Sequence, residues 1–265
     1  MKISKGRWLL ILGIVLVVID QVIKILVKTN MSIGEHFSVI GNWFQILFIE
    51  NEGMAFGMKF GGMFGKFLLT TFRICLFGFL CWWITGLVRR GYCTGKDSEG
   101  NKTYIKVPTG VLVGLTIITA GALGNIIDCL AYGQLFSEST RTAVASFGGS
   151  YAPVMFGKVV DMFYFPLIDT VWPDWMPVIG GRPFRFFEPV FNFADSCVTV
   201  GAAYLILFQY KFFTTEAEGK VTDSNKKKQA KYYVQLLDCV LFWQFSQFFQ
   251  NFSFRRFLYK LISIC

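Results

Sequence analysis

The sequence predicts an all-α membrane protein with four transmembrane helices, a small β-containing external segment, and external loops or short helices on the outer leaflet. Apolar residues make up 54% of the 265-residue chain, and the mean hydropathy is +0.49. Charged residues make up only 16%, whereas they fill about a quarter of a soluble domain. The net charge of +9 is concentrated at the ends of apolar runs, which is typical of topology determinants. We therefore predict no nucleic-acid partner.

Four apolar runs are long enough to cross a bilayer, which takes about 20 residues of helix. They cover about residues 8–27, 66–88, 107–127 and 195–213. The first run lacks a small-x-small cleavage site, so we interpret it as an uncleaved anchor. Residues 1–213 are predicted to form the four-helix domain, 214–231 a charged cytoplasmic linker, and 232–265 an amphipathic tail of unknown role.

The lysines and arginines predict the orientation of the four helices. They gather before the first run, between the second and third runs, and after the fourth. These clusters are Lys2, Lys5 and Arg7; Arg89, Arg90, Lys96, Lys102 and Lys106; and Lys220, Lys226, Lys227, Lys228 and Lys231. Four helices place all three clusters on one side, and the positive-inside rule makes that side cytoplasmic. Both termini are then cytoplasmic, and residues 28–65 and 129–194 are external.

The first external segment is expected to contain a strand and a tight turn. The residues from Trp43 to Ile49 alternate loosely, which favours a short strand or a small sheet. The following stretch, Asn51–Gly57, contains Gly53 and a second glycine, which indicates a turn with an exposed backbone. Such a loop is either an ordinary connection or a place where the backbone and the Asn51 amide meet an extended substrate.

Two aspartates border strongly apolar sequence and are the candidate catalytic residues. Asp161 lies in Val159–Phe163, and Asp195 directly precedes the apolar run from Cys197 to Phe208. A carboxylate in the bilayer centre costs about 2.5–3.5 kcal/mol on insertion scales, so such acids usually have a function. If the two carboxyl groups meet in space, they could share a proton and perform general acid–base chemistry.

Two further pairs of polar residues lie near the predicted outer membrane face. Asp20 and Lys24 are four residues apart, so they share a helix face as either a neutralising ion pair or a charged pair near a site. Asn125 and Asp128 are three residues apart beside glycines that permit close helix approach. They could join helices by hydrogen bonds, or Asp128 could act in a site directly.

Asn192 repeats this spacing three residues before Asp195. A helix N-terminus presents free N–H groups, so Asp195 could simply cap the last helix. A cap explains neither Asp161 nor the gathering of acids at one membrane face. The residues alone therefore leave catalysis and structure open for this pair.

The cysteines and the histidine do not predict a metal or a cofactor. The seven cysteines include no CxxC pair, and several lie within apolar runs. His36 is the single histidine, so a histidine-rich zinc site is excluded. We predict neither a disulfide framework nor a metal site.

Five patches of this sequence resemble the lipoprotein signal peptidase family, also called signal peptidase II. The resemblance covers roughly residues 8–213, and the order of the patches makes it specific. The patches are Asp20–Lys24, Asn51–Gly57, Gly121–Asp128, Val159–Phe163 and Phe191–Asp195.

The resemblance implies an aspartic endopeptidase of the bacterial plasma (inner) membrane, with its active site near the outer leaflet. It would remove the signal peptide from diacylglyceryl-modified prolipoproteins, cutting before the lipidated cysteine, with an activated water and no cofactor. The family pattern places the catalytic dyad on Asp161 and Asp195. It places support or substrate binding on Asp20, Lys24, Asn51, Gly53, Asn125, Asp128 and Asn192. Its partners would be the substrates and the lipid bilayer, and we predict a monomer.

The chain departs from the family pattern in two places. Cys129 follows Asp128 where many members carry arginine, and a thiol cannot replace the donors of a guanidinium. The segments Gln134–Lys158 and Asp169–Glu188 are longer than in compact members, which resembles the Bacteroidota-type branch.

Two other classes of function are consistent with the residues alone. A small ion or proton transporter subunit could use the same acids as an intramembrane relay. Transporters often contain internal repeats, and the two halves of this chain show none. An assembly protein could use the polar residues only to pack helices.

Overall fold

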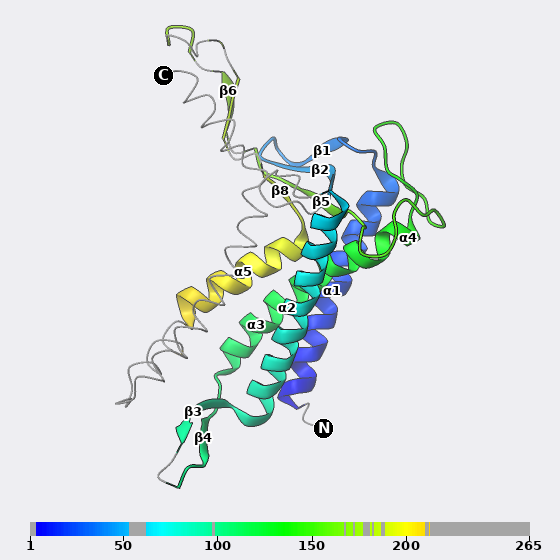
Figure 1. Ribbon diagram of the computed structural model, residues 1–265. Helices are drawn as coiled ribbons and strands as arrows, with labels where there is room; N and C mark the ends of the chain where they lie inside the picture. The colour runs from blue at the N-terminus through cyan, green and yellow to red at the C-terminus, as the bar shows by residue number, and fades with distance from the viewer. Residues whose placement is uncertain are drawn as a thin grey trace. The chain divides into compact units, whose positions relative to one another are not determined.

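The computed structural model describes residues 4–52, 62–96, 99–166, 168–171, 173–176, 181, 183–186, 189–209 and 212 (Figure 1). The chain divides into two compact units. Among the described residues, the first unit contains those within 1–21, 68–127 and 193–244, and the second contains those within 22–67 and 128–192. Gly53, the linker 214–231 and the tail 232–265 lie outside the described residues.

Three helices in the described part of the chain are long and apolar enough to cross a membrane. They are α1 (Lys5–Asn30), α2 (Met63–Arg90), and the helical stretch Thr109–Leu135, which joins α3 (Thr109–Ile127), the π-helix η2 (Asp128–Tyr132) and α4 (Gly133–Leu135). α5 (Phe193–Phe208) is apolar but has 16 residues. At 1.5 Å per residue it is roughly 24 Å long, less than the roughly 30 Å hydrocarbon core of a bilayer.

Local chemistry sets the ends of these helices. Thr29 and Asn30, the last two residues of α1, donate side-chain hydrogen bonds back to the carbonyls of residues four positions earlier. α2 ends at Arg90 and is followed by Gly91, whose φ of +85° suits a residue without a Cβ. A hairpin of β3 (Tyr92–Lys96) and β4 (Lys102–Ile105) then leads to α3.

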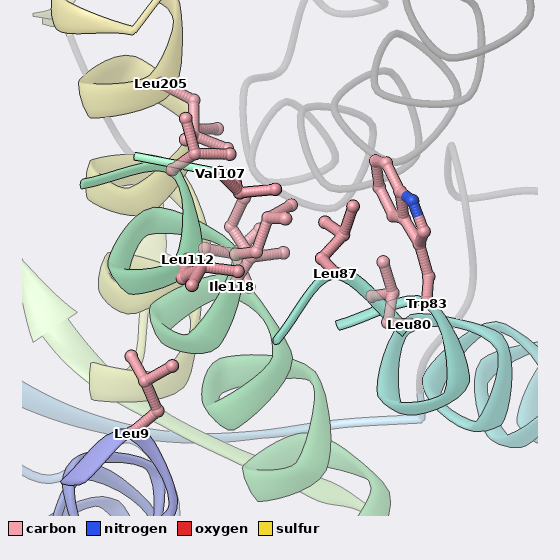
Figure 2. Packing of buried hydrophobic residues seen from close by; sticks show 12 residues of the cluster. Leu9, Leu80, Trp83, Leu87, Val107, Leu112, Ile118 and Leu205 are labelled. Atoms are coloured by element: carbon pink, nitrogen blue, oxygen red, sulfur yellow. The ribbon is translucent and has the colours of Figure 1, made fainter. Parts of the chain in front are cut away.

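The first unit has a core of aliphatic side chains and Trp83, with Leu9 contributed by α1, in which α3 and α5 pack closely (Figure 2). Small residues permit this approach. A Cβ on Gly121 would lie 2.8 Å from Val198 Cγ2, and one on Gly201 would lie 2.9 Å from Ile118 Cγ1. Close packing through glycine is the usual way in which apolar helices associate in lipid.

The second unit contains a four-stranded sheet in the order β1-β2-β5-β8. Its antiparallel strands are β1 (His36–Ile40), β2 (Phe44–Asn51), β5 (Val159–Tyr164) and β8 (Val190–Phe191). A separate hairpin pairs β6 (Ile168–Val171) with β7 (Pro183–Phe186). The all-α description is therefore too narrow. Strands were predicted only in the first external segment. Residues 159–164 and 190–191 are short apolar runs without the alternation of polar and apolar residues that indicates a strand.

Alternation along β5 separates a core face from a polar face. Val160 and Met162 join Phe48 and Tyr132 in a second hydrophobic core. Because successive strand residues point to opposite faces, Asp161 points away from that core. Asp161 is opposite Ile49 in the β2–β5 register.

Candidate functional site

The structure describes eight of the nine predicted site residues, and they form a group in each unit. The first unit contains Asp20, Asn125 and Asp195. The second contains Lys24, Asn51, Asp128, Asp161 and Asn192. Each candidate catalytic aspartate accordingly has its own set of neighbours within its unit.

Asp161 is held by asparagine amides in the second unit. It is 3% exposed, and its Oδ1 accepts a 2.7 Å hydrogen bond from Nδ2 of Asn192, which is fully buried. Asn51 Nδ2 makes a weaker approach of 3.4 Å to the other carboxylate oxygen, Oδ2. Asn51 is the last residue of β2, and Asn192 directly follows β8. The carboxylate of Asp161 on β5 therefore receives an amide donor from each of these two strand ends.

Lys24 and Asp128 form an ion pair beside the same strand. The ammonium and the carboxylate are 2.7 Å apart, and both side chains are 0% exposed. Asp128 Oδ2 also lies 3.5 Å from the N–H of Val160, the residue before Asp161. A buried pair that also contacts backbone can hold a strand end in place, which favours a positioning function for both residues.

Asp195 lies in the first turn of α5, in the first unit. Its Oδ1 accepts a 2.8 Å hydrogen bond from Asn125 Nδ2 on α3. Asn125 therefore joins α3 to α5 by a hydrogen bond, as the sequence suggested. The acceptor of that bond, Asp195, is a candidate catalytic residue. Asp195 is itself partly exposed.

Asp20 satisfies a free donor at the start of α5. It is 1% exposed, and its Oδ1 accepts a 2.9 Å hydrogen bond from the N–H of Ala194. The first N–H groups of a helix lack intrahelical partners, so Asp20 acts as a cap supplied by another helix. Gln21 donates to Asp20 Oδ2 and to the Gly124 carbonyl, both at 3.1 Å.

Sequence reasoning missed a buried cluster around Glu50 in the second unit. Lys28 is 0% exposed and forms an ion pair with Glu50, and Ser139 donates to the same carboxylate oxygen at 2.8 Å. Lys158 lies 3.6 Å from the other oxygen of Glu50. Burial raises the pKa of nearby Tyr151 well above its usual range, so this phenol stays protonated. Lys28 follows Lys24 by four residues, and that spacing could have identified it.

The cluster shows that the inserted segment Gln134–Lys158 is packed against the rest of the second unit. Its Ser139 reaches Glu50 on β2, and the Thr140 carbonyl accepts a 2.9 Å hydrogen bond from the N–H of Ile33. The Gly157 N–H donates to the carbonyl of Cys129 at 2.9 Å. Cys129 is buried, so its side chain is part of this packing.

Arg73 was also missed. It lies inside the apolar helix α2, yet only 6% of it is exposed. A buried charge within a membrane-grade helix is a functional candidate by default, and this signal is visible in the sequence.

These features define an integral membrane protein whose buried carboxylates and amides suit acid–base chemistry. Among the described residues, no group of three or more His, Cys, Asp or Glu side chains could hold a metal ion.

Comparisons with known proteins identify the family. The model of the family described as Signal peptidase (SPase) II matches residues 12–211. A lipoprotein signal peptidase of Porphyromonas gingivalis is 42% identical over 223 residues, which cover 83% of this chain and 91% of the relative. One from Amoebophilus asiaticus is 33% identical over 198 residues, covering 74% and 75% of the two chains. A solved bacterial membrane enzyme, determined in meso at 2.3 Å, aligns at TM-score 0.47 and 24% identity over 82% of this chain and 95% of that chain.

The chain belongs to the signal peptidase II family of lipoprotein signal peptidases. It is a membrane protease, and its similarity to the Porphyromonas relative confirms the resemblance to the Bacteroidota-type branch. This membership decides against the transporter and assembly hypotheses.

Proposed function

We propose that Asp161 and Asp195 form the catalytic dyad of this peptidase. The observation that carries the proposal is that each carboxylate is held by an asparagine amide within its own unit, at 2.7 Å from Asn192 and 2.8 Å from Asn125. Amide donors fix the orientation of a carboxylate and favour its ionised form. Two acids oriented in this way, in a protein of a protease family, are the best candidates for the reacting groups.

The chemistry follows from two carboxyl groups that share one proton. The ionised aspartate takes a proton from a water molecule, and the water oxygen attacks the scissile carbonyl carbon. The protonated aspartate donates to the carbonyl oxygen and so stabilises the charge that develops there. When the tetrahedral intermediate collapses, the C–N bond breaks and the leaving amine takes a proton from the dyad. The pair titrates as a unit, so its apparent pKa values do not assign the acid to one aspartate and the base to the other.

The remaining site residues are proposed to position the dyad or the substrate. Asp20 would hold the start of α5 and thereby Asp195, since it accepts from the N–H of Ala194, the residue before Asp195. Lys24 and Asp128 would hold the strand that carries Asp161. Gly53 is proposed, with Asn51, to meet the extended substrate backbone.

The substrate is proposed to be a diacylglyceryl-modified prolipoprotein, cut before its lipidated cysteine. We propose α5 as the fourth membrane helix, both termini in the cytoplasm, and the dyad near the outer leaflet of the bacterial inner membrane. The enzyme is proposed to act as a monomer and to need no cofactor.

The dyad can be tested with Asp161→Asn and Asp195→Asn variants. Each should insert into membranes at wild-type levels and leave a lipidated prolipoprotein uncut when the products are analysed by mass spectrometry. Asp174→Asn is the matched control, because Asp174 is exposed and lies outside both groups of site residues. Cleavage at the wild-type rate by either dyad variant would remove that aspartate from the mechanism.

A further inference from the structure

A groove of about 580 Å³ lies along three helices of the first unit. It is lined by α1, α2 and α3, with Ile14 and Ala120 among the lining residues. The lining part of α1 runs from Gly6 to Val18, which is roughly 18 Å at 1.5 Å per residue. A groove of this length along membrane helices suits an extended hydrocarbon chain.

The threonine hydroxyls in the groove already donate their protons within their own helices. Thr85, Thr116 and Thr119 line it, and each donates its hydroxyl at 2.7 Å to the carbonyl four residues earlier in its own helix. These threonines therefore offer a bound water only acceptor lone pairs and no donor, whereas a bound water usually makes about two to four hydrogen bonds. The occupant is therefore expected to be apolar along most of its length.

The groove is open on the side of α1. Leu10, Ile14 and Val18 line it, and these residues are 63%, 54% and 53% exposed. In a membrane protein such side chains contact lipid, so a lipid chain can enter sideways.

One end of the groove is positively charged. Arg89 lines it there, and a Cβ on Gly6 would lie 3.5 Å from Val88 Cγ1, which places the first turn of α1 against the last turn of α2. Lys5 and Arg7 flank Gly6 and are exposed. Basic residues at the mouth of a pocket between membrane helices are typical of sites for anionic lipid headgroups.

The geometry of α3 disfavours the peptide substrate as occupant. Thr116 lines the groove, and Asn125 donates to Asp195. The two are nine residues apart, about two and a half helical turns, so they point to opposite sides of α3. A peptide bound at Asp195 would meet the other face of this helix.

We propose that the groove is a binding site for an anionic phospholipid. One acyl chain lies along α1, α2 and α3, and the headgroup contacts Lys5, Arg7 and Arg89. The site is independent of the peptidase reaction.

The test uses the full-length protein in mixed micelles with palmitoyl-oleoyl phosphatidylglycerol or palmitoyl-oleoyl phosphatidylcholine, and native mass spectrometry counts the retained lipid. The wild type should retain phosphatidylglycerol preferentially, and Arg89→Gln should lower that preference about fivefold, as expected for one cation near a headgroup. Ile14→Trp should obstruct the middle of the groove and lower preferential retention. Val15→Trp is the matched control, because Val15 is 47% exposed on the same helix and does not line the groove.

Two results would overturn the proposal. Equal retention of both lipids by the wild type and by Ile14→Trp would show annular lipid only. A photo-crosslinker at Ile14 that captures the signal segment of a prolipoprotein in place of phosphatidylglycerol would make the groove a substrate site. Arg89→Gln changes an exposed residue, so it gives a result even where Ile14→Trp does not fold.

Discussion

The side chain of Asn192 holds the carboxylate of Asp161. It is fully buried, and its 2.7 Å hydrogen bond meets a carboxylate. A hydrogen bond to a charged group contributes about 1.5–3 kcal/mol, so Asn192→Ala should lower kcat roughly 10- to 100-fold. The acidic limb of the pH–rate profile, which reports the titration of the dyad, should move to higher pH, because the lost donor favoured the ionised form of Asp161.

Asn42→Ala serves as the control for Asn192→Ala, since Asn42 is exposed in the β1–β2 turn. It should leave both kcat and the pH profile unchanged. A drop in kcat for Asn192→Ala without any movement of the profile would indicate misfolding, and Asp161 would then be held by other groups.

For single residues, the sequence indicated the polar residues of the candidate site, but it did not indicate most of their contact partners. Spacing on a helix suggested that Asp20 and Lys24 form a pair, but it did not indicate that Asp20 caps α5 or that Lys24 binds Asp128. Partners from distant parts of the chain depend on packing that no local pattern encodes. Glu50 was missed for the same reason, because its partners come from α1 and from the inserted segment.

Among the elements, α3 depends on a glycine where it passes Asp20. A Cβ on Gly124 would collide with Asp20 Oδ2 and lie 3.1 Å from Ala194 Cβ. Gly124→Ala should therefore displace the Asp20 cap and destabilise the protein by about 1–3 kcal/mol, as a lost cap combined with overpacking would. Thermal unfolding in detergent measures the change.

Gly78 of α2 provides the comparison for Gly124→Ala, because nothing lies within 4 Å of a Cβ built there. Gly78→Ala should be neutral or stabilise the protein by up to about 1 kcal/mol, since alanine favours helix. Equal unfolding temperatures for the two variants would mean that α3 can move away from Asp20 at little cost.

The inserted segment and β2 are joined through the Glu50 cluster. Lys28→Met leaves the buried Glu50 carboxylate without its nearest cation, which costs about 3–5 kcal/mol in comparable buried pairs. The double variant Lys28→Met/Glu50→Leu removes both charges and should recover most of this loss. A double-mutant cycle on unfolding free energies gives the coupling directly.

Glu138→Gln is the surface control for this cycle. Glu138 pairs with Lys158 at 3.2 Å, but its side chain is 63% exposed, so the change should cost less than about 1 kcal/mol. If the double variant proves as unstable as Lys28→Met, the cluster stabilises the segment through packing and not through charge.

For the whole molecule, composition alone indicated a membrane protein because so few residues are charged. The helices could be predicted from the length of the apolar runs, because a membrane-spanning segment must satisfy its backbone hydrogen bonds internally and a helix does so. The sheet was largely missed because its strands come from three separate segments, and residues 190–191 are too short to show a period. The convergence of Asp161 and Asp195 on a shared proton stays a prediction that the variants above test.

The orientation of the chain in the membrane can be tested at two loops. Asn42 lies between β1 and β2, and Glu99 lies between β3 and β4, in a segment with five lysines and arginines. In a background with all seven cysteines replaced by serine, Asn42→Cys should react with a membrane-impermeant maleimide in spheroplasts. Glu99→Cys should react only after the membrane is permeabilised, because basic loops are retained in the cytoplasm. Labelling of Glu99→Cys in intact spheroplasts would invert the topology and place the sheet that carries Asp161 on the cytoplasmic side, where a peptidase acting at the outer leaflet could not reach its substrate.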